Sequence, residues 1–207
     1  MVEGAQVQHL RVTYNDIHNL IRKATPKIAE FDPDLMVAIG GGGFFPARVM
    51  RTFLRGSTGK KTLQIQAIGL SLYEPLLGTT AEQIGNEVIR TQWLGPDAGK
   101  LLLGKRVLIV DEVDDTRKTL HYALSELRKD VLTELNTYPV HEQEKLLGST
   151  KFAVFVVHNK LKGKLAELPA GMPYYSGADV GDVWLDYPWE ATDIEEHDRL
   201  AALDRTS

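Results

Sequence analysis

The residues best suited to chemistry lie in the middle of the chain, in the segment Val107–Thr119. Its apolar run is followed by two carboxylates, Asp111 and Glu112, and then by a short loop with two threonine hydroxyls. The loop leads into an expected helix, whose first backbone amides have no partner and favour a phosphate group. Carboxylates beside such a site fit if they hold neutral sugar hydroxyls and a metal ion. The segment therefore predicts a site for a phosphorylated sugar.

A plainer interpretation of this segment is a strand followed by an acidic N-cap that opens a helix. It accounts for any one of the residues taken alone. It does not account for the whole combination of apolar run, acidic pair, Asp-Thr and second threonine. We favour the functional interpretation, which requires a strand–loop–helix context.

A second candidate anion site is the run Gly40, Gly41, Gly42 and Gly43, which follows the apolar segment Leu35–Ile39. Without Cβ atoms, the backbone amides of such a loop can approach an anion closely. A tight turn between a strand and a helix is the alternative, but four glycines exceed what a turn needs. The run therefore predicts a second phosphate-binding loop.

The elements that must position these loops are strands alternating with helices. Such alternation predicts an α/β fold with a mainly parallel sheet covered on both faces, and ligands at the carboxyl ends of its strands. Pro46 is expected to start a helix, and Glu74–Ala98 to form a long, mobile loop. Asn15 is the expected cap of the first helix, which Pro26 is expected to kink or shorten. The expected strands are Leu35–Ile39, Leu63–Ile68, Val107–Val110 and Phe152–Val157.

Composition sets the class of protein. The 207 residues fit one domain, and the absence of cysteine excludes disulfides and thiolate metal sites. A net charge of −4 argues against a nucleic-acid surface. No apolar run is long enough to span a membrane, and the first residues do not resemble a secretory signal, so we expect a cytoplasmic protein.

Val107–Thr119 resembles the phosphoribosyl-pyrophosphate signature of type I phosphoribosyltransferases. Four further segments make the chain similar to the fungal 6-oxopurine members, and the resemblance covers about residues 12–198. It implies the type I phosphoribosyltransferase fold, a central mainly parallel sheet flanked by helices, with a small hood. One domain would span residues 1–207, with a core of about 12–160 and a hood of about 161–198 plus the N-terminal segment. The four segments are Ala38–Gly43, Gly69–Glu74, Arg90–Trp93 and Tyr187–Glu190.

The resemblance also assigns roles. Asp111 and Glu112 would hold the ribose hydroxyls, aided by Mg²⁺, and Glu190 would lie near a second Mg²⁺ or the purine. Asp115 would be the catalytic residue that exchanges a proton with N7 of the purine. The 5′-phosphate would be surrounded by Asp115, Thr116, Arg117, Lys118 and Thr119.

Two positions depart from the family pattern. Arg117 stands where most members have glycine, so it either contacts the phosphate or points outward and leaves the binding to backbone amides. Gly41 stands where some relatives carry a basic residue. The charge at the pyrophosphate loop would then come from Arg48 or from the bound metal.

The purine side of the site follows from the same resemblance. Trp184, with Val183 beside it, would stack on the base, although an isolated tryptophan is often a core or surface residue. Lys160 is favoured over His158 as the donor to the purine 6-oxo group, and an exposed polar strand end is the alternative for both. Leu72 and Tyr73 would begin the flexible loop that closes over the site.

The implied reaction transfers phosphoribose from phosphoribosyl pyrophosphate to a 6-oxopurine (xanthine, hypoxanthine or guanine), giving a nucleoside monophosphate. The family resemblance also implies a homodimer. The main alternative is a non-catalytic regulatory protein that binds phosphoribosyl pyrophosphate. A receiver-type signalling domain has no use for the glycine loop, and an NTPase would need the G-x-x-x-x-G-K-[ST] motif, which is absent.

Overall fold

A computed structural model of the chain describes residues 8–58, 63–72 and 88–205. Its main feature is a six-stranded sheet in which every neighbouring pair is parallel except β4, which runs antiparallel to β3. This confirms the expected α/β class with a mainly parallel sheet. The strand order is β4 (Val88–Gln92), β3 (Gln64–Leu72), β2 (Leu35–Gly40), β5 (Arg106–Asp114), β6 (Lys151–Lys160) and β7 (Tyr174–Val180).

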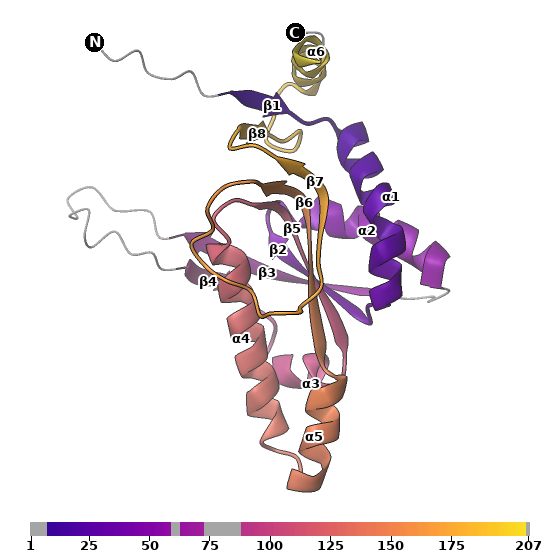
Figure 1. Ribbon diagram of the computed structural model, residues 1–207, viewed down its shortest axis with the longest axis vertical. Helices are drawn as coiled ribbons and strands as arrows, with labels where there is room; N and C mark the ends of the chain where they lie inside the picture. The colour runs from indigo at the N-terminus through magenta and orange to yellow at the C-terminus, as the bar shows by residue number, and fades with distance from the viewer. Residues whose placement is uncertain (1–7, 59–62, 73–87, 206–207) are drawn as a thin grey trace, which may run out of the picture.

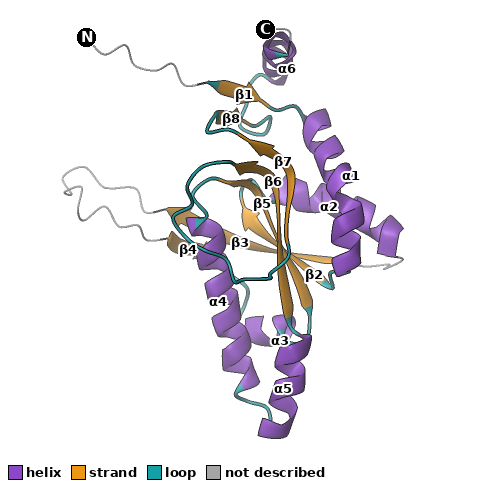
Figure 2. Ribbon diagram, viewed as in Figure 1, coloured by secondary structure: helices purple, strands orange, loops and turns teal. Residues whose placement is uncertain are grey.

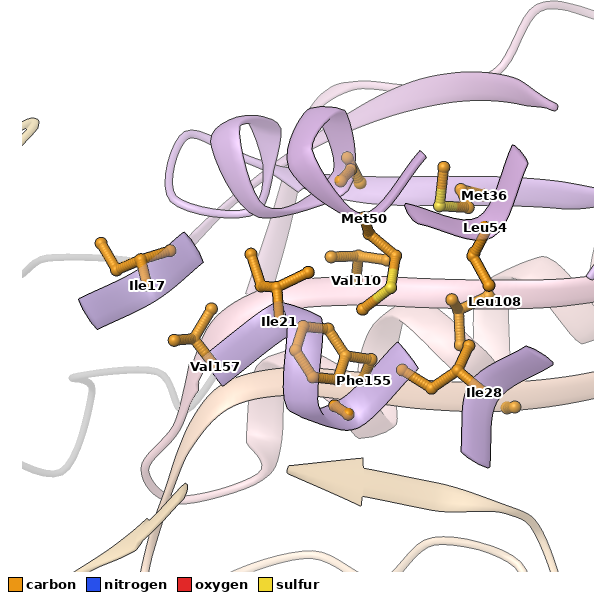
Figure 3. Close-up of a cluster of buried hydrophobic side chains, with 14 of the residues drawn as sticks. Ile17, Ile21, Ile28, Met36, Met50, Leu54, Leu108, Val110, Phe155 and Val157 are labelled. Carbon is orange, nitrogen blue, oxygen red and sulfur yellow. The ribbon is translucent and has the colours of Figure 1, made fainter. Parts of the chain in front are cut away.

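Helices cover both faces of this sheet (Figure 2). On one face α1 (Tyr14–Phe31) and α2 (Phe44–Thr58) pack on the strands, and Figure 3 shows Ile21, Met50 and Phe155 meeting there. On the other face lie α3 (Ala98–Leu102) and α4 (Lys118–Leu135), followed by α5 (Val140–Ser149). Burial of these apolar faces holds the strand ends in place.

The first helix departs from expectation at its N-terminus, and Pro26 does not shorten it. Its N-cap is Thr13, not Asn15, because the Thr13 and Asp16 side chains bond each other's backbone amides in a capping box. Pro26 lies inside the helix without ending it. Ile21 and Ile28 on either side are fully buried, and this packing outweighs the one hydrogen bond that proline removes.

Helix α2 begins at Phe44, so Pro46 lies in its first turn, where a missing amide costs little. The expected loop Glu74–Ala98 is wrong in part: Val88–Gln92 forms β4, which pairs with the end of β3, while residues 73–87 lie outside the described part. Strand β5 is also longer than Val107–Val110. Its ladder with β6 continues as far as Asp114, so the acidic pair belongs to the strand.

Beyond the carboxyl ends of β6 and β7 lies a smaller assembly (Figure 1). It consists of β1 (His9–Arg11) paired in parallel with β8 (Trp184–Asp186), together with α6 (Ile194–Asp204). His197 on α6 bonds the Val12 carbonyl through Nε2 at 2.9 Å, which fastens the C-terminal helix to the start of α1. Within the described residues, no helix is both long and apolar enough to cross a membrane.

Candidate active site

The two predicted anion-binding loops line one cavity of about 440 Å³ at the carboxyl ends of β2 and β5. These strands are neighbours paired in parallel, with Ala38 opposite Val110, so the residues that follow them emerge side by side. A larger cavity of about 570 Å³ lies between α1 and α6, but it contains neither loop. The smaller cavity is the candidate site because of the residues that line it, and not because of its volume. That lining includes Gly40, Gly41, Gly42, Asp111, Glu112, Asp115, Thr116, Arg117 and Thr119.

The glycines of the loop Gly40–Gly43 have different surroundings. A Cβ on Gly43 would lie 2.5 Å from the carbonyl oxygens of Ile39 and Val110, so the backbone could not close there. A Cβ on Gly42 would lie 1.1 Å from Oε2 of Glu112, so that glycine makes room for the carboxylate. Gly41 meets nothing within 4 Å and faces open space. The Gly40–Gly41 peptide bond is cis.

In the acidic pair, Asp111 is buried and Glu112 is half-buried. Burial and the neighbouring Glu112 raise the pKa of Asp111 well above its usual range, although the Glu112 amide donates to Asp111 Oδ1 at 2.9 Å. Burial, followed by repulsion from Glu190, raises the pKa of Glu112 to about 7. Glu112 Oε2 is buried and lacks a hydrogen-bond partner among the described residues. The pair is thus built to receive a cation or hydroxyl donors.

Glu190 is close enough to Glu112 to raise its pKa. No group of three or more acidic or histidine side chains converges on one point in the described part of the chain. A magnesium ion here would therefore rely on one or two carboxylates plus water and ligand oxygens. That arrangement is common for magnesium, which keeps several waters and binds substrate phosphates.

Asp115 lies at the mouth of the phosphate loop between two lysines. Its Oδ1 is 2.8 Å from Lys162 Nζ, and its Oδ2 is 3.4 Å from Lys160 Nζ. Burial alone would raise the pKa of Asp115, but the two lysines together lower it. The carboxylate is therefore an anion at neutral pH, and it remains 43% exposed.

Arg117 turns its side chain back toward the end of β5. Its φ of 70° is in the left-handed region where glycine is favoured, and it precedes the first residue of α4. Its guanidinium turns back to Asp114 Oδ2, with N–O distances of 3.0 and 2.9 Å, and lies over the ring of Tyr174. Thr116 and Thr119 line the cavity, whereas Lys118 begins the helix.

His158 and Lys160 have different surroundings. His158 is buried, which lowers its pKa to about 4, and its Nδ1 lies 2.9 Å from the Tyr187 hydroxyl. That hydroxyl donates to the Glu112 carbonyl, so the histidine is the donor to Tyr187 in the neutral tautomer. Lys160 is the one of the two that reaches Asp115.

The expected purine-stacking residues lie in the smaller assembly. Trp184 on β8 is 58% exposed, with its ring 6.5 Å from that of His9, and Val183 precedes it in a turn closed by Gly181. Among the residues described, neither Val183 nor Trp184 lines the 440 Å³ cavity of the candidate site. Leu72 ends β3, and Tyr73 lies outside the described residues.

Sequence reasoning missed several side chains at this site. Trp189 stacks between Phe45, 5.7 Å away, and Tyr187, 4.8 Å away, and so joins the start of α2 to the segment before Glu190. Its buried Nε1 is close enough to Glu112 to lower the pKa of that carboxyl, and it has no hydrogen-bond partner among the described residues. Lys162 and Lys164 were also missed, although the alternation Lys160, Lys162, Lys164 after a strand was a usable signal.

Comparison with solved structures places the fold. A purine phosphoribosyltransferase from Pyrococcus horikoshii aligns with a TM-score of 0.61 at 21% identity, covering 90% of this chain and 97% of that one. The architecture is therefore that of the type I phosphoribosyltransferases. A Neisseria gonorrhoeae protein solved with bound ppGpp aligns with a TM-score of 0.74 at 37% identity, covering 97% and 99% of the two chains.

Comparison with curated proteins gives the family, although no model of a known protein family matches the chain. The hypoxanthine-guanine phosphoribosyltransferase of Schizosaccharomyces pombe is 52% identical over 202 residues, 93% of this chain and 94% of that protein. Xanthine phosphoribosyltransferase 1 of Saccharomyces cerevisiae is 48% identical over 214 residues, 95% and 97% of the two chains. The chain belongs to the 6-oxopurine phosphoribosyltransferases.

Proposed function

We propose that the chain transfers the 5-phosphoribosyl group of phosphoribosyl pyrophosphate to N9 of a 6-oxopurine, giving a nucleoside monophosphate and pyrophosphate. The observation that carries this proposal is the meeting of the glycine loop, the acidic pair and the phosphate loop in one cavity. It agrees with relatives of about 50% identity that are named for transfer to hypoxanthine, guanine or xanthine.

Each wall of the cavity has its own task in this proposal. Residues 115–119 hold the 5′-phosphate through the threonine hydroxyls and the amides at the start of α4. Asp111 and Glu112 hold the ribose hydroxyls, and the amides of Gly40–Gly43 face the pyrophosphate. Because these groups are fixed by buried strands, most of the rate enhancement would come from positioning and electrostatic stabilisation.

We propose Mg²⁺ as the cofactor. The fit rests on the buried, unpartnered Oε2 of Glu112 and on the closeness of Glu190, which together form a negative region in need of a cation. Asp111 is a further candidate ligand, and one or two of these three carboxylates would hold the ion together with water and substrate oxygens. When bound, the ion supplies positive charge that neutralises the pyrophosphate leaving group.

Asp115 and Lys160 form a donor and acceptor pair suited to one edge of a purine. The 6-oxo oxygen and N7 are adjacent on that edge. Lys160 Nζ, 3.4 Å from Asp115, would donate to the oxygen, while the Asp115 carboxylate would accept the N7 proton. His158 is less suited, because it is buried and already bonded to Tyr187.

The hood would hold the remaining face of the base. Trp184 keeps an exposed ring for stacking, with Val183 beside it, and the loop that begins at Leu72 and Tyr73 would close over the substrates. Discrimination among xanthine, hypoxanthine and guanine would depend on contacts to the substituent at C2. The ppGpp bound to the Neisseria relative, a guanosine nucleotide, agrees with a purine nucleotide product.

We further propose that the protein works as a homodimer in the cytoplasm and has no nucleic-acid partner. The net charge of −4 supports the last point, the homodimer follows from the family resemblance, and the location rests on the sequence expectation alone.

The test combines the chain with phosphoribosyl pyrophosphate, Mg²⁺ and a 6-oxopurine and follows nucleoside monophosphate. We expect product with Mg²⁺ and none in excess chelator. A regulatory protein of the same fold would bind phosphoribosyl pyrophosphate yet form no product, and full activity in chelator would overturn the metal assignment.

A further inference from the structure

Asp114 is the most deeply buried carboxylate near the site, with a fully buried side chain. Its Oδ2 accepts two hydrogen bonds from Arg117 and one from the Tyr174 hydroxyl, at 2.8 Å. Its Oδ1 lies 3.4 Å from Lys164 Nζ. These four residues, which we name the Asp114 cluster, come from the end of β5, the phosphate loop, the segment after β6 and the start of β7.

In this cluster two cations, Arg117 and Lys164, pair with the single carboxylate of Asp114, largely shielded from water. The side chains of Arg117 and Lys164 are only 18% and 12% exposed. A buried charge is costly unless it is paired and hydrogen-bonded, so each member depends on the others. Burial and the bond to Asp114 raise the pKa of Tyr174 well above its usual range, so its hydroxyl stays a donor.

The same side chains also fix the backbone of the phosphate loop. Lys164 Nζ donates to the carbonyl oxygens of Asp114 and Asp115, at 2.7 and 3.0 Å. The Leu165 amide donates to the Thr116 carbonyl at 3.0 Å. Arg117 holds a left-handed φ that is uncommon for a residue with a side chain. Bonds from outside the loop therefore hold a conformation that glycine would adopt freely.

We propose that the Asp114 cluster is a positioning device for the phosphate loop, and that Arg117 serves it by anchoring to Asp114 instead of binding the phosphate. Asp114, Lys164 and Tyr174 become positioning residues that aim the amides of α4 and the carboxylate of Asp115. The inference rests on the proposed role of residues 115–119 as the phosphate site.

The test is a double-variant cycle on Asp114→Leu and Arg117→Gly, with the dissociation constant for phosphoribosyl pyrophosphate in Mg²⁺ measured calorimetrically. We expect each single variant to bind about tenfold more weakly, because the loop loses its anchor. The double variant removes both charges and leaves a glycine that tolerates positive φ. It should bind within about threefold of either single variant, since groups in one network are not additive.

A direct phosphate contact from Arg117 gives a different pattern. Asp114→Leu would then free the guanidinium and leave binding unchanged or tighter, which would overturn the proposal. A double variant weakened about a hundredfold, as independent effects would give, would also overturn it.

Two milder variants keep the test readable if Asp114→Leu does not fold. Tyr174→Phe removes one donor to Asp114 and keeps the ring beneath Arg117, so we expect binding two- to fivefold weaker. Lys164→Met removes the two bonds to the loop carbonyls and should weaken binding about tenfold, with a lower kcat because Asp115 is displaced. Wild-type affinity in both variants would contradict the positioning role of the cluster.

A wild-type chain that binds the sugar phosphate but forms no nucleotide would refute the proposed reaction. The binding pattern expected of these variants would remain.

Discussion

At the scale of single residues, Asp115 is the candidate catalytic carboxylate. Its two lysine neighbours lower its pKa, so it is a weak base but a stable anion. Such a group would accept the N7 proton only as positive charge develops on the purine, and its own negative charge would stabilise that positive charge. Its role should therefore appear mainly in the transition state.

We expect Asp115→Asn to lower kcat by about 10²- to 10⁴-fold, the range for a positioned acid or base, with little change in affinity for phosphoribosyl pyrophosphate. The amide keeps the shape of the side chain and loses the charge. Steady-state kinetics and direct binding would separate the two quantities. Equal losses in kcat and in affinity would indicate a phosphate-positioning role instead.

At the scale of elements, the parallel pairing of β2 with β5 brings the glycine loop against the acidic pair. A Cβ added to Gly42 would overlap the Glu112 carboxylate. A substitution at Gly42 in the glycine loop is therefore expected to displace the side chain of Glu112 at the end of β5.

Gly42→Ala should therefore displace Glu112 and reduce kcat/KM by about a hundredfold, since displacements near 1 Å can cost this much. Gly41→Ala is the matched comparison, because its Cβ would meet nothing within 4 Å, and its loss should be at most a tenth as large. Initial rates for the two variants, with thermal melts to check folding, test this. Similar losses would mean that the loop backbone, and not Glu112, is what alanine disturbs.

Much of this arrangement could be predicted from the sequence. The apolar runs located the central strands, and the rule that ligands bind at strand carboxyl ends brought both loops together. The boundaries of β5 and the existence of β4 could not be predicted, because both depend on pairing with distant strands. The orientation of the Arg117 side chain toward Asp114 could not be predicted either, since it depends on Tyr174 and Lys164, which lie far along the chain.

At the scale of the whole molecule, the sheet and the smaller assembly are joined through buried polar contacts. His158 on β6 bonds Tyr187, which in turn bonds the Glu112 carbonyl. The neutral histidine is required here, because burial lowers its pKa to about 4 from an ordinary value near 6.5. The connection between the two parts should therefore be sensitive to acid.

The sign of that sensitivity follows from proton binding. Between about pH 6.5 and 4 the unfolded chain binds a proton at His158 that the folded chain does not, so the contribution of His158 to the free energy of unfolding falls as pH falls. That loss should approach about 3 kcal/mol, at 1.36 kcal/mol per pKa unit. Glu112, whose pKa is raised to about 7, contributes the opposite slope, so the test is the difference between variants and not the wild-type slope. In denaturant titrations, the free energy of unfolding of the wild type minus that of His158→Gln should fall as pH falls across this range. His141→Gln, at an exposed histidine of α5, is the control and should run parallel to the wild type. A His158→Gln variant that also runs parallel to the wild type would contradict the assignment.

The central claim, that this chain transfers phosphoribose to a 6-oxopurine, is tested most directly by initial rates with xanthine, hypoxanthine, guanine and adenine. Each assay contains phosphoribosyl pyrophosphate and Mg²⁺, and the nucleotide and pyrophosphate are quantified together. We expect at least one 6-oxopurine to give its N9-linked monophosphate with one pyrophosphate per nucleotide, at a rate far above that with adenine. If none of the three 6-oxopurines gives a nucleotide, or if adenine is the preferred base, the account is contradicted.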